Sequence, residues 1–322
     1  MATYKEIKGT QIEVLASDPS NPVEGQVWYN TTSNVLKGQA ATAAGAWATG
    51  GNLNTARRIL EGAGQSPQTA GLVFGGLTNT ASVGDTELYN GSSWTELNNL
   101  GTARQGLGGS GTQTAALGFG GSPGDKAVTE SWNGTNWTEV NDLGTARYDI
   151  VGSGTQTSAL GSSGYKSGQR QLNELWNGTN WTEVNDLNTN IQGRSGCGAD
   201  NTSALVFGGS PSANTESWNG TNWTEVGDLN TARAFLGAAG TQTSALAFGG
   251  GPSVSTATEE WNGSSWTTSP GSMNTARTSL SGLGTAASAL AAGGFLGPPG
   301  VTAATEEWTG AGAGVTRTFT DS

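Results

Sequence analysis

Short apolar runs alternate with polar turns along most of the chain, and the alternation repeats every 42 to 47 residues. One clear copy has apolar runs at 234–239 and 244–248, an alternating run at 258–261, and the start of a fourth run at 266–268. Each run has the length of a strand, and none shows the 3.6-residue spacing of an amphipathic helix. The pattern therefore predicts a repeating unit of four antiparallel strands.

Similar residue types mark the ends of the predicted strands in most copies. An Asn-Thr-Ala-Arg or Gly-Thr-Ala-Arg phrase usually precedes the first strand, Thr-Gln-Thr separates the first from the second in the clearest copies, and Gly-Gly usually ends the second. An aromatic residue ends the third strand and a Trp begins the fourth. These aromatic pairs are Tyr89/Trp94, Trp132/Trp137, Trp176/Trp181, Trp218/Trp223 and Trp261/Trp266. A degenerate copy begins at Asn188. Such regular placement of Trp indicates a packed fold and not a disordered chain.

One unit of about 43 residues is too small to bury a core of its own. Six units can do so if they pack face to face in a ring, which is a β-propeller. We therefore predict an all-β fold, a six-bladed β-propeller of four-stranded antiparallel blades. The strand that follows each Arg has the smallest side chains, so we expect it to lie nearest the axis. The Trp-bearing strands are expected at the rim.

The two ends of the repeat predict how the ring closes. The last copy lacks the Trp of a fourth strand, whereas Trp47 stands ten residues before Arg57, as Trp223 does before Arg233. We expect residues 45–50 to complete the blade made by 277–309. The predicted domains are an N-terminal extension with a β-hairpin (1–44), the propeller (45–309) and a C-terminal tail (310–322).

The N-terminal extension carries its own aromatic residues, Trp28 and Tyr29, beside a predicted hairpin turn. Exposed aromatics on a small segment suit docking to another protein. The same segment could instead pack on the propeller as a plug, and the sequence leaves both open.

Composition removes several classes of function. The net charge is −11, the sequence pI is about 4.4, and the 14 basic residues are spread along the chain. Nucleic-acid binding and attraction to an anionic membrane are therefore not expected. Histidine is absent and Cys197 is the one cysteine, so imidazole catalysis and an intrachain disulfide are excluded. We expect no enzyme activity, no metal and no cofactor. No signal-peptide pattern is present, which predicts synthesis in a host cytoplasm without export.

The repeat resembles the kelch repeat in its Gly-Gly, its aromatic pair and the Arg that opens the next unit. The match is strong at Gly75-Gly76, Gly120-Gly121, Gly208-Gly209 and Gly249-Gly250, and weaker near 161–164 and in the last copy. The resemblance implies a propeller with the strand after each Arg innermost, and it implies no function. Residues 18–30 are similar to a short module of phage virion appendage proteins.

Two groups of side chains are candidates for a site. The first is a ring of arginines at the channel mouth: Arg57, Arg104, Arg147, Arg233 and Arg277. They could hold an anion, but pairing with carbonyls or with a loop aspartate (Asp142, Asp186 or Asp228) is the favoured interpretation. The second is a partner-binding loop with Tyr165, Lys166, Gln169 and Arg170. Function in propellers often lies in such loops.

These observations favour a non-enzymatic structural protein of a phage virion. The propeller would be mounted on the tail or capsid by the N-terminal segment, with Trp28 and Tyr29 in the docking surface. Its partners would be other virion proteins, with a host-surface glycan or receptor as a further candidate. The alternative is a free, lectin-like propeller that binds carbohydrate.

Overall fold

The computed structural model describes residues 12–20, 25–41, 44–168, 171–210, 212–298, 300–312 and 314–319. The chain divides into two compact units. One contains residues 46–309, and the other contains residues 1–45 together with 310–322. No helix forms in the described ranges, and hence none that could cross a membrane. The all-β class expected from the strand-length runs is confirmed.

The larger unit contains six four-stranded antiparallel sheets, which we call blades 1 to 6 in chain order. Blade 1 is β5 (Glu61–Gly62), β6 (Leu72–Phe74), β7 (Thr86–Tyr89) and β8 (Trp94–Leu97). Blade 2 is β9 (Gly108–Thr112), β10 (Ala115–Phe119), β11 (Thr129–Trp132) and β12 (Trp137–Val140). Blade 3 is β13 (Tyr148–Gly154), β14 (Ala159–Tyr165), β15 (Asn173–Trp176) and β16 (Trp181–Glu183).

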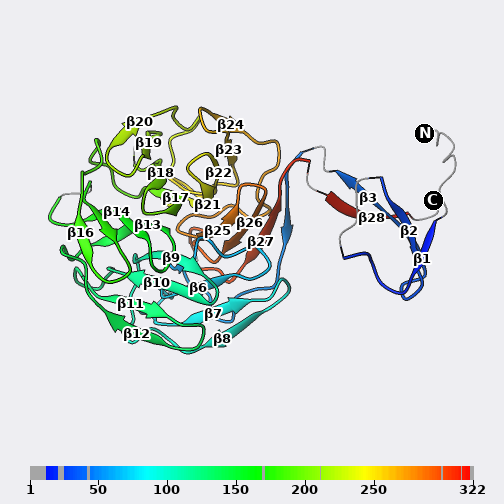
Figure 1. Cartoon of the computed structure of the whole chain (residues 1–322), viewed down its shortest axis with the longest axis horizontal. Coiled ribbons are helices and arrows are strands. Elements are labelled where there is room, and N and C mark those ends of the chain that lie inside the picture. The colour runs from blue at the N-terminus through cyan, green and yellow to red at the C-terminus, as the bar shows by residue number, and fades with distance from the viewer. Residues whose placement is uncertain are drawn as a thin grey trace. The chain divides into compact units, whose positions relative to one another are not determined.

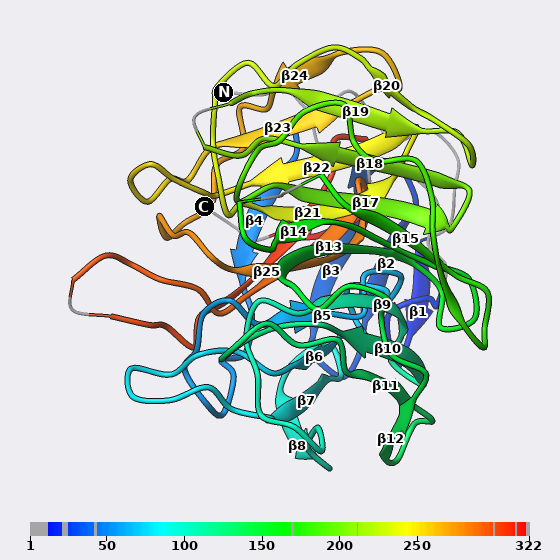
Figure 2. The ribbon, with the colours of Figure 1, turned by 90° about the vertical axis from the view of Figure 1, so that its left-hand side faces the viewer.

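Blade 4 is β17 (Ser195–Asp200), β18 (Ser203–Phe207), β19 (Thr215–Trp218) and β20 (Trp223–Glu225). Blade 5 is β21 (Gly237–Thr241), β22 (Ser244–Phe248), β23 (Thr258–Trp261) and β24 (Trp266–Thr268). Blade 6 is β25 (Ser281–Thr285), β26 (Ser288–Ala292), β27 (Thr305–Thr309) and β4 (Ala46–Thr49). Figure 1 shows the blades set around a common axis, and Figure 2 shows the strands of blades 4 and 5 following one another within each sheet.

The smaller unit holds a seventh four-stranded sheet, one more sheet than the sequence predicts. Its strands are β1 (Glu13–Leu15), β2 (Val27–Asn30), β3 (Val35–Ala41) and β28 (Gly314–Phe319), in that order. The predicted hairpin is present as β2 and β3. Residues 310–322, expected as a separate tail, instead supply β28, which pairs with β3. The sequence pattern missed this strand because β28 lies outside the repeat and has no partner nearby in sequence.

The first strands of successive blades contact one another around the axis, and β25 of blade 6 contacts β5 of blade 1. Their side chains are small because neighbouring backbones approach closely there. A Cβ added to Gly152 of blade 3 would lie 2.1 Å from the carbonyl oxygen of Gly109 in blade 2. Each sheet by itself is open, so the ring depends on contacts between blades.

Blade 6 is built from both ends of the repeat, as Trp47 predicts. β4 pairs antiparallel with β27, and Trp47 lies opposite Trp308 (blue strand beside the red β27 in Figure 1). The Trp47 ring lies 5.4 Å from Trp308 and 4.9 Å from Phe248. Residues more than 250 positions apart therefore share one sheet.

The Trp that begins each fourth strand also joins its blade to the preceding one. In five blades its indole N–H donates to the hydroxyl of a Thr in the third strand of that neighbour. These pairs are Trp47–Thr258, Trp94–Thr305, Trp137–Thr86, Trp181–Thr129 and Trp266–Thr215, at 2.9 to 3.1 Å. In blade 4 the indole N–H of Trp223 finds no partner within the described ranges. There Asn173 replaces the Thr and bonds to Ser162 and Asn185 instead.

We expect Trp47→Ala to destabilise the propeller by about 3–5 kcal/mol, because it removes a buried indole and its bond to Thr258. Calorimetry of the full chain measures the loss as a lower melting temperature. Trp28→Ala is the control, since Trp28 is equally bulky and buried but belongs to the smaller unit. Equal effects of both variants on the propeller transition would contradict the role assigned to β4.

Candidate functional site

A buried ion pair joins an arginine before the first strand of each blade to a glutamate in its third strand. The pairs are Arg57–Glu87 (2.6 Å), Arg104–Glu130 (3.0 Å), Arg147–Glu174, Arg194–Glu216 (2.8 Å), Arg233–Glu259 (2.8 Å) and Arg277–Glu306 (3.1 Å). None of these side chains is more than 4% exposed. The arginine ring of the sequence analysis is therefore enclosed within the blades.

Each of these glutamates also holds the linker that leads into its blade. Glu130 accepts a hydrogen bond from the amide of Gly101 at 2.7 Å. The corresponding linker amides in the other blades are those of Asn54, Gly144, Asn188, Asn230 and Asn274, at 2.6 to 2.7 Å. Arg104 in turn donates to the carbonyl of Gly120 at 2.9 Å. One carboxylate thus fixes the guanidinium group and the chain entry of the blade.

The pairing with backbone carbonyls that the sequence suggests is present, as in the bonds of Arg104 to Gly120 and of Arg233 to Gly249. The close ionic partner of each arginine, however, is a glutamate and not the suggested loop aspartate. Asp142 and Asp228 instead accept bonds from the backbone amides of Thr129 and Thr215. The glutamate was missed because Glu-x-Trp looks like a solvated position on an alternating strand. Burial lowers the pKa of the arginines, to about 10 for Arg277, and the attraction of Glu306 partly opposes that shift.

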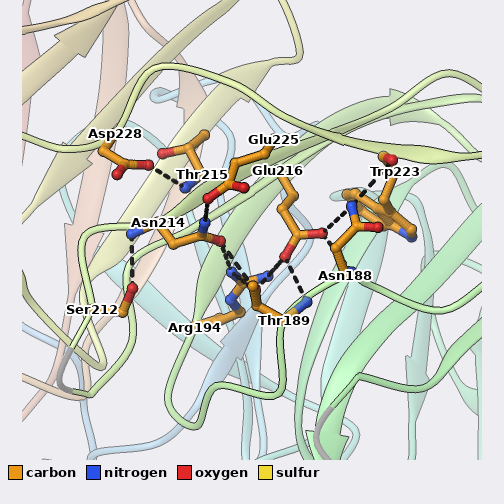
Figure 3. A network of polar contacts seen from close by, with 10 residues as sticks. All are labelled: Asn188, Thr189, Arg194, Ser212, Asn214, Thr215, Glu216, Trp223, Glu225 and Asp228. Carbon is orange, nitrogen blue, oxygen red and sulfur yellow. Dashed lines mark hydrogen bonds and ion pairs between the residues drawn. The ribbon is translucent and has the colours of Figure 1, made fainter.

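Blade 4 shows that the position of the guanidinium group matters more than the position of the arginine in the sequence. Ile191 occupies the usual Arg position, and Arg194 follows three residues later. Figure 3 shows the Arg194 guanidinium reaching Glu216 from there, with Asn214 and Thr189 also bonded to it. The degenerate copy therefore keeps the pair by a different local path.

A ring of six left-handed residues surrounds the axis, one from each blade, two positions after the usual Arg position. They are Ile59, Gly106, Asp149, Gly193, Phe235 and Ser279, with φ between 51° and 70°. In five steps the amide of one member donates to the carbonyl of the member in the preceding blade, at 2.6 to 3.1 Å. One of these bonds runs from the amide of Ile59 in blade 1 to the carbonyl of Ser279 in blade 6, so the series also joins the first blade to the last. We call these residues the left-handed ring.

A positive φ is costly for a residue with a side chain, and most of all for β-branched Ile59. Four members of the left-handed ring nevertheless carry side chains. The repeated sequence pattern does not predict this ring, because the six ring residues share a backbone conformation and not a residue type.

The left-handed ring lines a cavity of about 100 Å³ on the axis. Its wall includes Leu60, Leu107 and Ile150, and the carboxyl-bearing Glu61 and Asp149. Of the six paired arginines only Arg194 lines the cavity. The predicted convergence of arginines on the channel is therefore wrong, and the ionisable groups at the axis are mainly acidic.

The other candidate residues lie elsewhere. Tyr165 ends β14, is half-buried, and its ring lies 5.3 Å from that of Tyr148. Lys166 follows it and is also half-buried, whereas Gln169 and Arg170 lie outside the described residues. Of the predicted partner-binding loop, the structure therefore describes Tyr165 and Lys166.

In the smaller unit Trp28 is fully buried, which corrects the expectation of an exposed docking aromatic. Its indole N–H and the side-chain amide of Asn30 both donate to Oδ1 of Asp18, at 3.0 and 2.7 Å. Lys37 forms an ion pair with the same carboxylate. Together these three bonds lower the pKa of Asp18 to about 2, and the bond from Lys37 has the largest effect. Tyr29 remains half-buried. Trp28 therefore holds this sheet together.

No three His, Cys, Asp or Glu side chains gather to hold a metal ion in the parts of the chain that are described. Comparison with known proteins finds no matching family model and no matching curated sequence. Among solved structures, the chain resembles the structure of YjhT with a TM-score of 0.64 and 13% identity. The match covers 79% of this chain and 95% of that one. At this identity the likeness shows the β-propeller fold alone.

We expect Glu130→Gln to destabilise the protein by about 3–5 kcal/mol, because it leaves the buried Arg104 charge without its partner. Urea unfolding measures the change. Glu139→Gln is the matched control, since Glu139 lies opposite Glu130 on the next strand but is exposed. The pair would not have this role if the two variants unfolded at the same urea concentration.

Glu61 generates a prediction on pH. Burial raises the pKa of its carboxyl from 4.5 to about 8. The folded protein therefore binds this proton more tightly than the unfolded chain does. The stabilisation is complete below about pH 4.5 and is lost as pH rises through about 8. In Glu61→Gln the free energy of unfolding should fall less between these pH values, as urea unfolding at several pH values will measure. A profile parallel to that of the unsubstituted protein would refute the assignment.

Proposed function

We propose that this protein is a non-enzymatic structural component of a phage virion, with a six-bladed kelch-like propeller mounted on the tail or capsid by the smaller unit. The observation that carries the proposal is the division of the chain. The strand β2 lies within the segment 18–30, which resembles a module of virion appendage proteins, and this strand belongs to a sheet separate from the propeller. Both ends of the chain contribute to that sheet, so the propeller is inserted between its third and fourth strands.

The smaller unit has features that suit docking. Its edge strands are β1 and β28, and edge strands offer unpaired backbone groups to a partner. Val14 on β1 is 67% exposed, Ile12 just before it is 45% exposed, and Phe319 at the end of β28 is 39% exposed. These are three of the four large apolar side chains found exposed in the described ranges. The fourth, Leu296, is in a loop of the propeller. Other virion proteins are the proposed partners of these two edges.

The propeller suits the role of a rigid head that contacts the host surface. The rim tryptophans and the left-handed ring join neighbouring blades. The acidic chain disfavours binding to nucleic acid. We propose that the loops between second and third strands, including Tyr165 and Lys166, meet a host glycan or receptor. Synthesis in the host cytoplasm precedes assembly into the particle.

Deleting residues 1–45 together with 310–322 tests the mounting role. We expect the remaining propeller to fold, because residues 46–309 form a compact unit, and to be lost from purified particles. Mass spectrometry of particles made with each version measures incorporation. Val14→Asp is the finer variant, with Asp18 and Trp28 left intact so that the small sheet still folds.

Two results would count against this proposal. Particles that retain the truncated protein would show that the propeller itself is the attachment site. A free lectin would be favoured if the truncated protein binds a glycan array and the full-length protein is absent from particles.

A further inference from the structure

The axial cavity is enclosed on the side away from the left-handed ring. The side-chain amide of Gln65 in blade 1 donates to the carbonyl of Gly198 in blade 4 at 2.6 Å. Blades 1 and 4 are three apart in a series of six, so this bond crosses the axis. A smaller cavity of about 20 Å³ lies beside it, lined by both residues and by Glu61. Glu61 therefore stands between the two cavities, with Gln65 as a floor beneath it.

Two carboxyl groups approach this cavity from either side of blade 2. A Cβ added to Gly109 would lie 2.5 Å from Cγ of Glu61, which comes from blade 1. A Cβ added to Gly106 would lie 2.8 Å from Oδ1 of Asp149, which comes from blade 3. Glycine at both positions leaves the room that the two acidic side chains occupy. Neither acid has an ion-pair partner among the described residues.

A third polar group at the cavity also lacks a partner. Ser281 lines the cavity and is 4% exposed, and its hydroxyl makes no hydrogen bond to the part of the chain that the structure describes. It lies next to Gly62, the residue after Glu61. Buried polar groups are nearly always hydrogen-bonded in folded proteins. Ser281 therefore places a polar group without a described hydrogen-bond partner in the cavity wall, on the blade 6 side.

We propose that the axial cavity binds a small organic cation with a primary ammonium group, held by Glu61 with help from Asp149 and Ser281. An ammonium group has three donors and no acceptor, which matches carboxylates and a hydroxyl oxygen. Arg194, the one cation in the wall, is already paired with Glu216, so it neither neutralises these acids nor attracts an anion.

The wall favours an alkylammonium over a metal ion. Polar and apolar groups both contribute to it, and the apolar part includes Leu236 and Phe235. A metal such as Ca²⁺ needs six to eight oxygen ligands, whereas a ligand with an apolar body gains from such a wall. One water needs roughly 10–15 Å³ of such a cavity, so about 100 Å³ holds roughly seven to ten non-hydrogen atoms.

Binding should also release a proton. Burial raises the pKa of Glu61 to about 8 and that of Asp149 to about 6, so near pH 7 Glu61 is largely protonated in the empty site. An ammonium ion favours the carboxylate, and the proton leaves to solvent. The other titratable groups that line the two cavities are Arg194, which is paired, and Cys197, whose pKa burial raises to about 12.

The test is calorimetric titration of the full chain at pH 7 with butylammonium chloride, in phosphate and in MOPS buffer. We expect saturable binding with a buffer-dependent heat, which reports the released proton. Glu61→Gln should bind about tenfold or more weakly, the loss expected for one charge-assisted hydrogen bond, and without the buffer-dependent heat. Glu96→Gln, on the exposed face of β8, is the matched control and should bind like the unsubstituted protein.

Several outcomes would overturn the proposal: no saturable binding to the unsubstituted protein, equal binding by Glu61→Gln, equal binding of neutral 1-butanol, or binding of Ca²⁺ or Mg²⁺ in place of butylammonium. A thermal melt without ligand checks that each variant folds. If Glu61→Gln does not fold, Asp149→Asn decides the matter by the same criteria, since it removes the other carboxylate at the ring. None of these results depends on whether the protein is part of a virion.

Discussion

The buried pair of arginine and glutamate is the interaction on which the propeller depends most. A blade of four short strands has little core of its own, and the chain must enter each blade at a fixed place beside the axis. The glutamate of the third strand fixes that place by binding both the entering backbone and the guanidinium group. Because removing a buried charge from water is costly, each partner requires the other. Blade 4 keeps the pair although its arginine has moved along the sequence.

Contacts between blades are then made at three distances from the axis. Nearest the axis, the backbones of the left-handed ring bond to one another. At mid-radius, glutamine side chains of the first turn reach back, as Gln156 does to Ser131 and Gln242 does to Ser217, at 3.0 and 2.9 Å. At the rim, indole groups bond to threonine hydroxyls. These bonds involve groups that a single blade would leave unsatisfied, so a blade gains its stability from its neighbours.

The close packing of the first strands decides which side chains reach the axis. Small residues bring the first strands together, and their inner edges leave room for a few larger side chains. Glu61 and Asp149 occupy that room without cationic partners, in a protein whose other buried carboxylates in the blades are paired with arginine. The symmetry of the repeat is broken at these positions, which is what a site for an asymmetric ligand requires. The smaller unit is built on a different scheme, with Asp18 as the shared acceptor of three side chains.

The sequence by itself determined the class of fold, the four-strand unit and the pairing of Trp47 with the last blade, because these follow from strand-length runs and from a period. It did not determine the seventh sheet, since β28 pairs with β3 and the whole propeller lies between these two strands in the sequence. Nor did it determine which acid each arginine meets, whether Trp28 is exposed, or which residues surround the axis. Those are properties of side chains and backbones that lie far apart in sequence, and only the closing of the ring brings them together.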